Sequence, residues 1–183
     1  MSLSPRYAPL SIALHWLMLL LLVAVYACIE LRELFPRGSE PRELIKTWHF
    51  MLGLLVLVLV TIRLWARWRH PAPPISPSPP PWQNRLAQLM HLALYGLMLG
   101  MPIGGWLILS AEGKPIPFFG LTLPPLVAAD PTLAELVEEI HETAGVVGYW
   151  LIGLHAVAGL AHHYLTRDNT LLRMLPASRR LGS

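Results

Sequence analysis

The chain has 183 residues, of which 54% are hydrophobic and 14% charged, and its mean hydropathy is +0.49. These values exclude a disordered chain, a coiled coil and most water-soluble domains. The formal charge of +3 would suit a nucleic-acid-binding protein, but no basic stripe interleaved with aromatic residues is present to hold a phosphate backbone. The one cysteine, Cys28, excludes an intrachain disulfide and any CxxC motif.

The apolar residues are gathered in four blocks, each of about 20 residues or more. The blocks run over residues 11–31, 44–65, 86–109 and 136–165. A helix that rises 1.5 Å per residue crosses a hydrocarbon core of roughly 30 Å in about 20 residues. Only a helix satisfies its own backbone polar groups there. We therefore predict an all-α integral membrane four-helix bundle that forms one domain over residues 1–183.

A proline-rich segment separates the second and third blocks. Residues 70–82 read HPAPPISPSPPPW and contain seven of the chain's 18 prolines. Proline lacks a backbone donor and fixes its own dihedral angle, so this segment is predicted to be an extended linker without helix. A second long loop, residues 112–130, follows the third block on the opposite side of the membrane.

The basic residues predict the orientation. Nine lie on the side that holds the N-terminus, the linker and the C-terminus: Arg6, Arg63, Arg67, Arg69, Arg85, Arg167, Arg173, Arg179 and Arg180. Five lie on the opposite side: Arg32, Arg37, Arg42, Lys46 and Lys114. Ten of the eleven acidic residues also lie on that opposite side, and the exception is Asp168. Because basic loops stay inside, both termini are expected in the cytoplasm.

Seven of the eight histidines fall within a block or at its end, where imidazole is costly and each histidine is therefore a functional candidate. They are His15, His49, His91, His141, His155, His162 and His163. Depth sorts five of them into two layers. The outer layer holds His49 and His141, and the inner layer holds His15, His91 and His155.

The fourth block carries one histidine of each layer. His141 and His155 are 14 residues apart, which places them about 40° apart on one helix face and roughly 21 Å apart along its axis. Such an arrangement suits two stacked metal centres. Two imidazoles per layer fit the six-coordinate iron of a b-type haem, whereas zinc would require three or four converging ligands. The outer pair is His49 with His141. His155 pairs with His15 or His91, and the spacing leaves that choice open.

Glycines follow three of these histidines at a constant offset. Gly53, Gly145 and Gly159 each come four residues after a candidate ligand. A flat macrocycle needs room against the backbone beside its axial ligand, and glycine provides it. Close helix packing also explains glycines in membranes, although it does not explain this offset. His162, seven residues after His155, is a candidate for a quinone site or a proton path, and a solvated helix end is the alternative.

Five segments carry a resemblance to known proteins. They are Arg6-Tyr7, residues 11–16 (SIALHW), residues 91–95 (HLALY) with Pro102 and Gly105-Trp106, residues 150–155 (WLIGLH) and residues 161–176 (AHHYLTRDNTLLRMLP). Together they resemble the prokaryotic cytochrome b561 family over essentially the whole chain. The likeness is greatest to small standalone members that transfer electrons from superoxide to ubiquinone. Relatives with the same core serve as haem subunits of hydrogenases and formate dehydrogenases.

The resemblance implies four transmembrane helices in the bacterial inner membrane, two haems b and a ubiquinone acceptor. It assigns His15 with His155 to the inner haem, and His49 with His141 to the outer haem. Superoxide is then expected to react on the periplasmic side. The basic residues that would attract this anion are Arg32, Arg37, Arg42, Lys46 and Lys114. Ion pairing with neighbouring glutamates is the alternative role for these residues.

Two other functions stay open at this point. One is a haem b subunit that passes electrons between a partner dehydrogenase, or another donor, and quinone. The other is a haem-free transporter or channel whose histidines relay protons. The sequence shows no interrupted helix and no inverted repeat, which counts against the transporter.

Overall fold

A computed structural model describes residues 6–176, so Arg179 and Arg180 of the expected basic cluster lie outside the described residues. Four long helices dominate it: α1 (Pro9–Arg32), α2 (Glu40–Arg69), α3 (Pro81–Ala111) and α4 (Pro131–Ala161). Each of the four is long and apolar enough to cross a membrane. The predicted helical membrane bundle is therefore confirmed.

Each helix begins before the apolar block that it contains. A proline occupies the first or second helical position in every case: Pro9, Pro41, Pro81 and Pro131. Proline is favoured there because its fixed dihedral suits the first turn and its missing donor is not needed. Pro81 and Trp82 consequently belong to α3, and the non-helical linker covers residues 70–80 instead of the expected 70–82. The expectation was wrong at this boundary.

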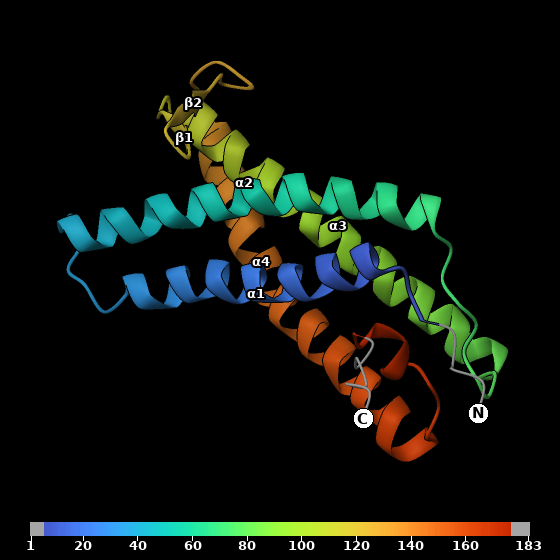
Figure 1. Cartoon of the computed structure of the whole chain (residues 1–183). Helices are drawn as coiled ribbons and strands as arrows, with labels where there is room; N and C mark the ends of the chain where they lie inside the picture. The colour runs from blue at the N-terminus through green and yellow to red at the C-terminus, as the bar shows by residue number, and fades with distance from the viewer. Residues whose placement is uncertain (1–5, 177–183) are drawn as a thin grey trace, which may run out of the picture.

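The helices pack as two hairpins. In Figure 1, α1 and α2 run side by side, and the α3–α4 pair crosses them at a steep angle. The helix pairs in closest contact are α1 with α2, α3 with α4, and α2 with α3. We call the end that holds the start of α1 and the end of α4 the termini end. The opposite end, with the α1–α2 turn and residues 112–130, is the loop end.

The core lies where α1, α2 and α3 meet. Its buried members are Met18, Leu21, Val56, Val60 and Met98. The fourth helix contributes little, since Ala134 and Gly148 are its only buried residues. Large apolar side chains on its surface are exposed, among them Trp150, Leu154 and Val157. An apolar surface this extensive is what a helix presents to lipid.

A short hairpin at the loop end departs from the purely helical expectation. Strands β1 (Ile116–Phe118) and β2 (Leu121–Leu123) pair antiparallel, with Ile116 opposite Leu123. The two turn residues, Phe119 and Gly120, both have positive φ, as a tight hairpin turn requires. Ile116 is 2% exposed and packs on Leu54 and Leu109, so the hairpin covers the loop end of the bundle.

The C-terminal segment closes the termini end. It contains the π-helix η1 (His162–Thr166) and the 3-10 helix η2 (Leu172–Met174). The Asn169 N–H donates to the Ser76 carbonyl at 3.1 Å, and the Ser76 N–H donates to Asn169 Oδ1 at 2.9 Å. Trp16 Nε1 of α1 donates to the Met174 carbonyl at 2.8 Å. The linker and the start of α1 are thereby tied to the end of the chain.

Candidate functional site: two layers of facing histidines

The loop-end layer joins α2 to α4. The rings of His49 and His141 are neighbours in an edge-to-face arrangement, with their centroids 6.4 Å apart and their planes at 75°. His49 Nδ1 lies 3.0 Å from the Val25 carbonyl, which can only accept, so Nδ1 carries the proton and Nε2 keeps its lone pair. His141 Nδ1 is buried with no hydrogen-bond partner among the described residues. Both rings thus retain nitrogen atoms that the protein does not use.

The termini-end layer brings three histidines together. His15 of α1 and His155 of α4 have ring centroids 6.3 Å apart, whereas His91 of α3 lies at 5.4 Å from His155. His91 Nδ1 donates to the Ala87 carbonyl of its own helix. Arg63 of α2 donates from Nη2 to His15 Nδ1 at 3.0 Å. All three imidazoles that the sequence predicted for this layer are therefore neighbours.

The ring separations have a chemical meaning. A metal–imidazole bond is about 2 Å long, so a metal shared by two rings holds its two nitrogens about 4 Å apart. Two ring radii bring the centroid separation near the 6.4 Å of His49 with His141 and the 6.3 Å of His15 with His155. Among residues 6–176 no group of three or more His, Cys, Asp or Glu side chains is arranged to hold a metal ion. The residues present thus fit a metal-containing group that would be held by two imidazoles.

The glycines differ in their surroundings. A Cβ at Gly53 or Gly159 would meet no atom within 4 Å, and at Gly145 it would lie 3.7 Å from Met101 Cε. Gly148 is different, because the Tyr26 hydroxyl occupies the space that its Cβ would need. Helix packing accounts for Gly148, whereas the glycines that follow the histidines adjoin open or loosely filled space, as Gly96, Gly100 and Gly153 also do.

Each layer adjoins a cavity. The larger, of about 500 Å³, lies at the termini end and is lined by His15, His91, His155 and His162. Arg63 and Arg67 of α2 also line it, and no carboxylate does among the described residues. The smaller, of about 340 Å³, runs between α3 and α4 beside His141. Gly104 forms part of its wall, and a Cβ there would approach His141 Nδ1 to 3.2 Å.

His162 has a carboxylate partner. Its Nδ1 lies 2.6 Å from Asp168 Oδ2, and the Asp168 side chain is only 3% exposed. The π-helix ends at Thr166, and the left-handed backbone of Arg167 (φ 54°), which follows it, turns Asp168 back toward the helix. Burial works to raise the pKa of Asp168, but hydrogen bonds from His162 and from the Thr170 N–H outweigh it and hold the pKa below its ordinary value.

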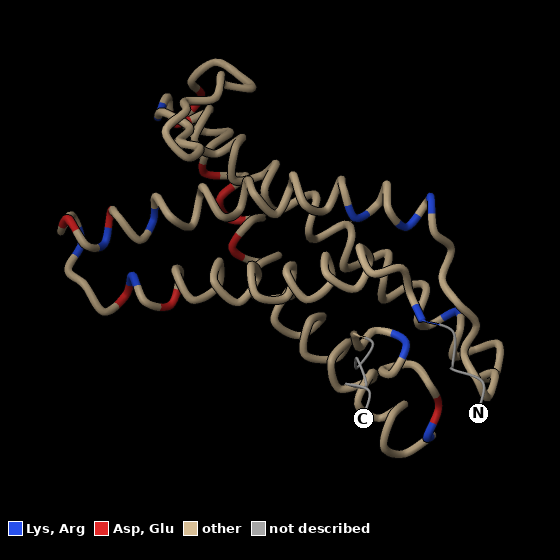
Figure 2. The backbone as a smooth tube through the Cα atoms, in the orientation of Figure 1, with Lys and Arg blue, Asp and Glu red and all other residues tan. Residues whose placement is uncertain are grey.

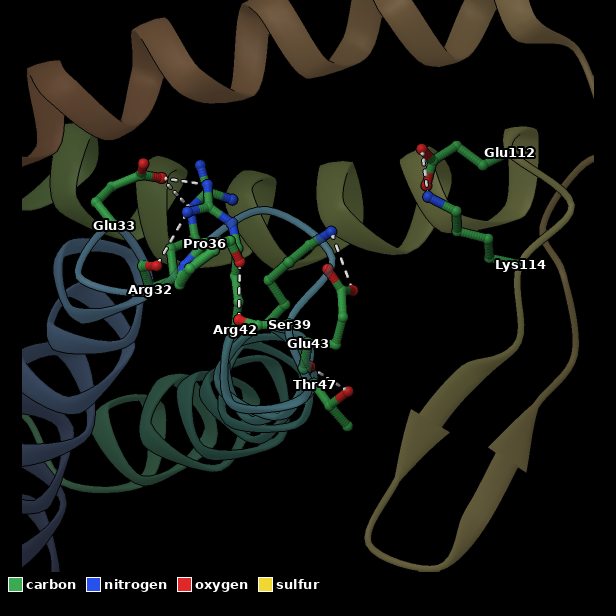
Figure 3. A network of polar contacts seen from close by, with 10 residues as sticks. Arg32, Glu33, Pro36, Ser39, Arg42, Glu43, Thr47, Glu112 and Lys114 are labelled. Atoms are coloured by element: carbon green, nitrogen blue, oxygen red, sulfur yellow. Dashed lines mark hydrogen bonds and ion pairs between the residues drawn. The ribbon is translucent and has the colours of Figure 1, made fainter.

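The five candidate anion-attracting residues lie at the loop end among carboxylates (Figures 2 and 3). Four of them form ion pairs: Arg32 with Glu33 at 3.0 Å, Arg42 with Glu33 at 2.8 Å, Lys46 with Glu43 at 3.4 Å and Lys114 with Glu112 at 2.8 Å. The hydrogen bond from Arg42 holds the pKa of Glu33 below its usual range, so this carboxylate keeps its charge. Arg37, the fifth, is exposed.

Four residues around these layers were not predicted from the sequence: Arg63, Tyr95, Gly104 and Asp168. Arg63 and Tyr95 are joined by a hydrogen bond of 3.3 Å from Arg63 Nε to the Tyr95 hydroxyl. The sequence signals were an arginine inside an apolar block, a doubled glycine, and the one acidic residue at the termini end. None of these signals specifies a partner without the fold.

The fold and the histidine layers describe an integral membrane helical bundle suited to a flat, bis-imidazole-ligated group. A family model described as prokaryotic cytochrome b561 matches residues 6–177. Cytochrome b561 homolog 1 of Escherichia coli K12 is 42% identical over 171 residues, covering 93% of this chain and 97% of the relative. The probable superoxide oxidase CybB of Yersinia pestis is 41% identical over 174 residues, covering 95% and 98%.

A more distant relative, cytochrome b561 homolog 2 of E. coli K12, is 32% identical over 186 residues, covering 94% of this chain and 93% of its own length. The chain belongs to the prokaryotic cytochrome b561 family, whose members are haem b electron-transfer proteins.

Proposed function

We propose that this protein is a di-haem cytochrome b that oxidises superoxide at the loop end and reduces ubiquinone at the termini end. The observation that carries the proposal is the repetition of one ring separation, 6.4 Å and 6.3 Å, in two histidine layers. The identity of 41% with a relative named probable superoxide oxidase supports the choice of superoxide as donor. Family membership favours electron transfer over a haem-free transporter.

His49 and His141 would hold the outer haem, and His15 and His155 the inner one. His91 is the less suitable partner, because its ring lies 5.4 Å from His155 and leaves less room for a metal than the other two pairs do. When bound, haem b supplies an iron centre that accepts and releases single electrons. Gly53, Gly145 and Gly159 would leave space beside the ligands, because their positions adjoin open or loosely filled space.

Arg63 has a role in this proposal as a partner for the haem carboxylates. If His15 held the haem iron through Nε2, its proton would be on Nδ1, which lies 3.0 Å from the Arg63 Nη2 donor. Arg63 would then turn toward an acceptor, and the haem carboxylates are anions of the required kind. Arg67 lines the same cavity and offers a second guanidinium. Bidentate pairing of guanidinium with carboxylate makes arginine suited to this task.

Ubiquinone would bind in the part of the termini-end cavity that His162 lines, beside the space that the inner haem would take between His15 and His155. His162 is the lining side chain that we assign to the quinone or to its protons. The reaction balances when two superoxide anions each give one electron, two dioxygen molecules leave, and one ubiquinone takes two electrons and two protons to become ubiquinol.

The orientation completes the proposal. Basic residues dominate the termini end and acidic residues the loop end (Figure 2), so we place both termini in the cytoplasm and the protein in the bacterial inner membrane. Superoxide would then react at the periplasmic surface. The ion pairs of Arg32, Arg42, Lys46 and Lys114 support a modest contribution of these residues to attracting the anion.

Spectroscopy of the purified protein tests the haem assignment. We expect a sharp α-band on dithionite reduction and two haems per chain in a pyridine haemochrome assay. Absence of the α-band would refute every electron-transfer function, and one haem per chain would refute the two-layer assignment. Reduction by a partner dehydrogenase but not by superoxide would instead favour the subunit function.

A further inference from the structure

The only acidic residue at the termini end of the chain is buried against a cavity-lining histidine. Ten of the eleven acidic residues precede residue 143, and Asp168 alone follows it. Its side chain is 3% exposed and contacts His162 Nδ1 at 2.6 Å. A lone carboxylate is costly to bury unless it is well hydrogen-bonded. The arrangement therefore calls for an explanation beyond solubility or membrane orientation.

The local backbone is shaped around this contact. The Asp168 N–H donates to the His162 carbonyl at 3.1 Å, and the Thr166 hydroxyl donates to the same carbonyl at 2.6 Å. The Thr170 N–H donates to Asp168 Oδ1 at 2.8 Å, and Oδ2 accepts from His162 Nδ1 and, at 3.5 Å, from the Thr166 hydroxyl. π-helical turns are rare in proteins, and those that do occur often lie at functional sites. The Asp168 N–H and both of its carboxylate oxygens are therefore hydrogen-bonded, which fixes the carboxylate beside the ring.

The contact also determines which edge of the ring faces the cavity. A carboxylate only accepts, so His162 Nδ1 carries a proton and donates to Asp168. His162 lines the cavity of about 500 Å³, whereas Asp168 is not part of its wall. The opposite edge of the ring, with Nε2, is consequently the edge available to a molecule in that cavity.

We propose that Asp168 is a positioning residue that orients His162, so that the Nε2 edge of the ring faces the cavity and relays a proton to a quinone oxygen there. This proposal rests on the proposed quinone reductase function. Nε2 takes up a proton from the solvent at the termini end, and the hydrogen bond from Nδ1–H to Asp168 keeps the ring in place. The proton on Nε2 then passes to the quinone oxygen, while Nδ1 keeps its own proton and its hydrogen bond to Asp168. The second proton comes from water that enters the cavity, and both electrons come from the donor of the proposed reaction.

The test separates the two half-reactions of the purified holoprotein in detergent. Reduction of the haem by a superoxide pulse and its reoxidation by a short-chain ubiquinone are followed at the α-band in stopped flow. We expect Asp168→Asn to leave the superoxide half-reaction unchanged and to slow reoxidation about tenfold, as part of the 10²–10⁴-fold that a positioned acid contributes. Asp168→Glu, which keeps a carboxylate, should restore most of the rate. The control Glu135→Gln removes an exposed carboxylate of α4 and should change neither half-reaction.

A double-mutant cycle distinguishes positioning from a structural role. In a His162→Gln background, Asp168→Asn should cause no further slowing, because Asp168 acts only through the imidazole. Equal slowing in both backgrounds, loss of haem in Asp168→Asn, or full activity of Asp168→Asn would overturn the proposal.

If the wild-type protein is reduced by superoxide but ubiquinone never reoxidises it, the proposed quinone function fails first and this proposal falls with it. If ubiquinone reoxidises the wild-type protein normally and Asp168→Asn at the same rate, only the positioning role is refuted.

Discussion

His49 and His141 approach each other from different helix hairpins, α2 of the first and α4 of the second, with ring centroids 6.4 Å apart. His15 and His155 repeat this relationship at the termini end, again with α4 as one partner. The helix α4 therefore supplies a histidine to each layer, and the histidine that it contacts comes from α2 or α1. A group held in either layer would link the two hairpins.

The inner layer allows a direct comparison between His15 and His91. We expect His15→Leu to reduce the haem content from two to one per chain, because the 6.3 Å pair is lost. His91→Leu should keep both haems, since its ring at 5.4 Å is not the assigned ligand. Haemochrome stoichiometry and the low-spin electron paramagnetic resonance signals measure both outcomes. Haem loss in His91→Leu with two haems retained in His15→Leu would reverse the assignment.

Filling the space at Gly53 should affect haem binding more than folding. Gly53 and Gly153 are both helical, and a Cβ at either meets no atom within 4 Å. Of these two glycines, only Gly53 comes four residues after a candidate ligand. Gly53→Leu is expected to lose the outer haem, and Gly153→Leu, the matched control, to keep two. Equal haem content in the two variants would show that the offset of four residues has no role in haem binding.

Ion pairing at the loop end predicts a weak dependence of the superoxide reaction on charge. Lys114 lies 2.8 Å from Glu112, and the pair is partly exposed, so its net field at a distance is small. Lys114→Ala should change the rate of haem reduction by superoxide less than about twofold, and added salt should change it little. A steep fall in rate with ionic strength would show that these basic residues attract the anion after all.

Asp168 should make the stability of the folded protein fall when the pH becomes strongly acidic. Its pKa in the folded protein is below the ordinary value of 3.8, so its contribution to stability is complete above that value and disappears as pH falls through the folded pKa. The thermal midpoints of wild type and Asp168→Asn should differ by a constant amount near neutral pH. That difference should shrink only below about pH 4. A difference that already shrinks between pH 7 and pH 5 would indicate that another group is responsible.

Much of the architecture is predictable because a bilayer restricts the choices. Apolar blocks of about 20 residues have helix as their only stable form, so the four spans follow from hydropathy alone. The helix ends were less predictable, since hydropathy marks the lipid-facing length while prolines such as Pro81 and Pro131 mark where the helix begins. The β1–β2 hairpin was missed because three-residue strands are too short for a periodic signal.

The site divides in a similar way. The helical spacing of His141 and His155 is sufficient to predict that they share one face, because both lie on a single regular element. The partners of His155 did not follow from spacing, since they lie on other helices and depend on how the hairpins cross. The contact between His162 and Asp168 was equally out of reach, because it requires a π-helical turn and a left-handed residue at Arg167. Local periodicity carries no information on either feature.

The central claim is that electrons pass from superoxide through the bound haem to ubiquinone. The most direct measurement mixes the oxidised holoprotein with a superoxide pulse in a stopped-flow spectrometer and then adds ubiquinone. We predict that the α-band rises within the pulse, is abolished by superoxide dismutase, and decays when ubiquinone is added with formation of ubiquinol. A protein whose α-band appears with dithionite but never with superoxide would contradict the claim.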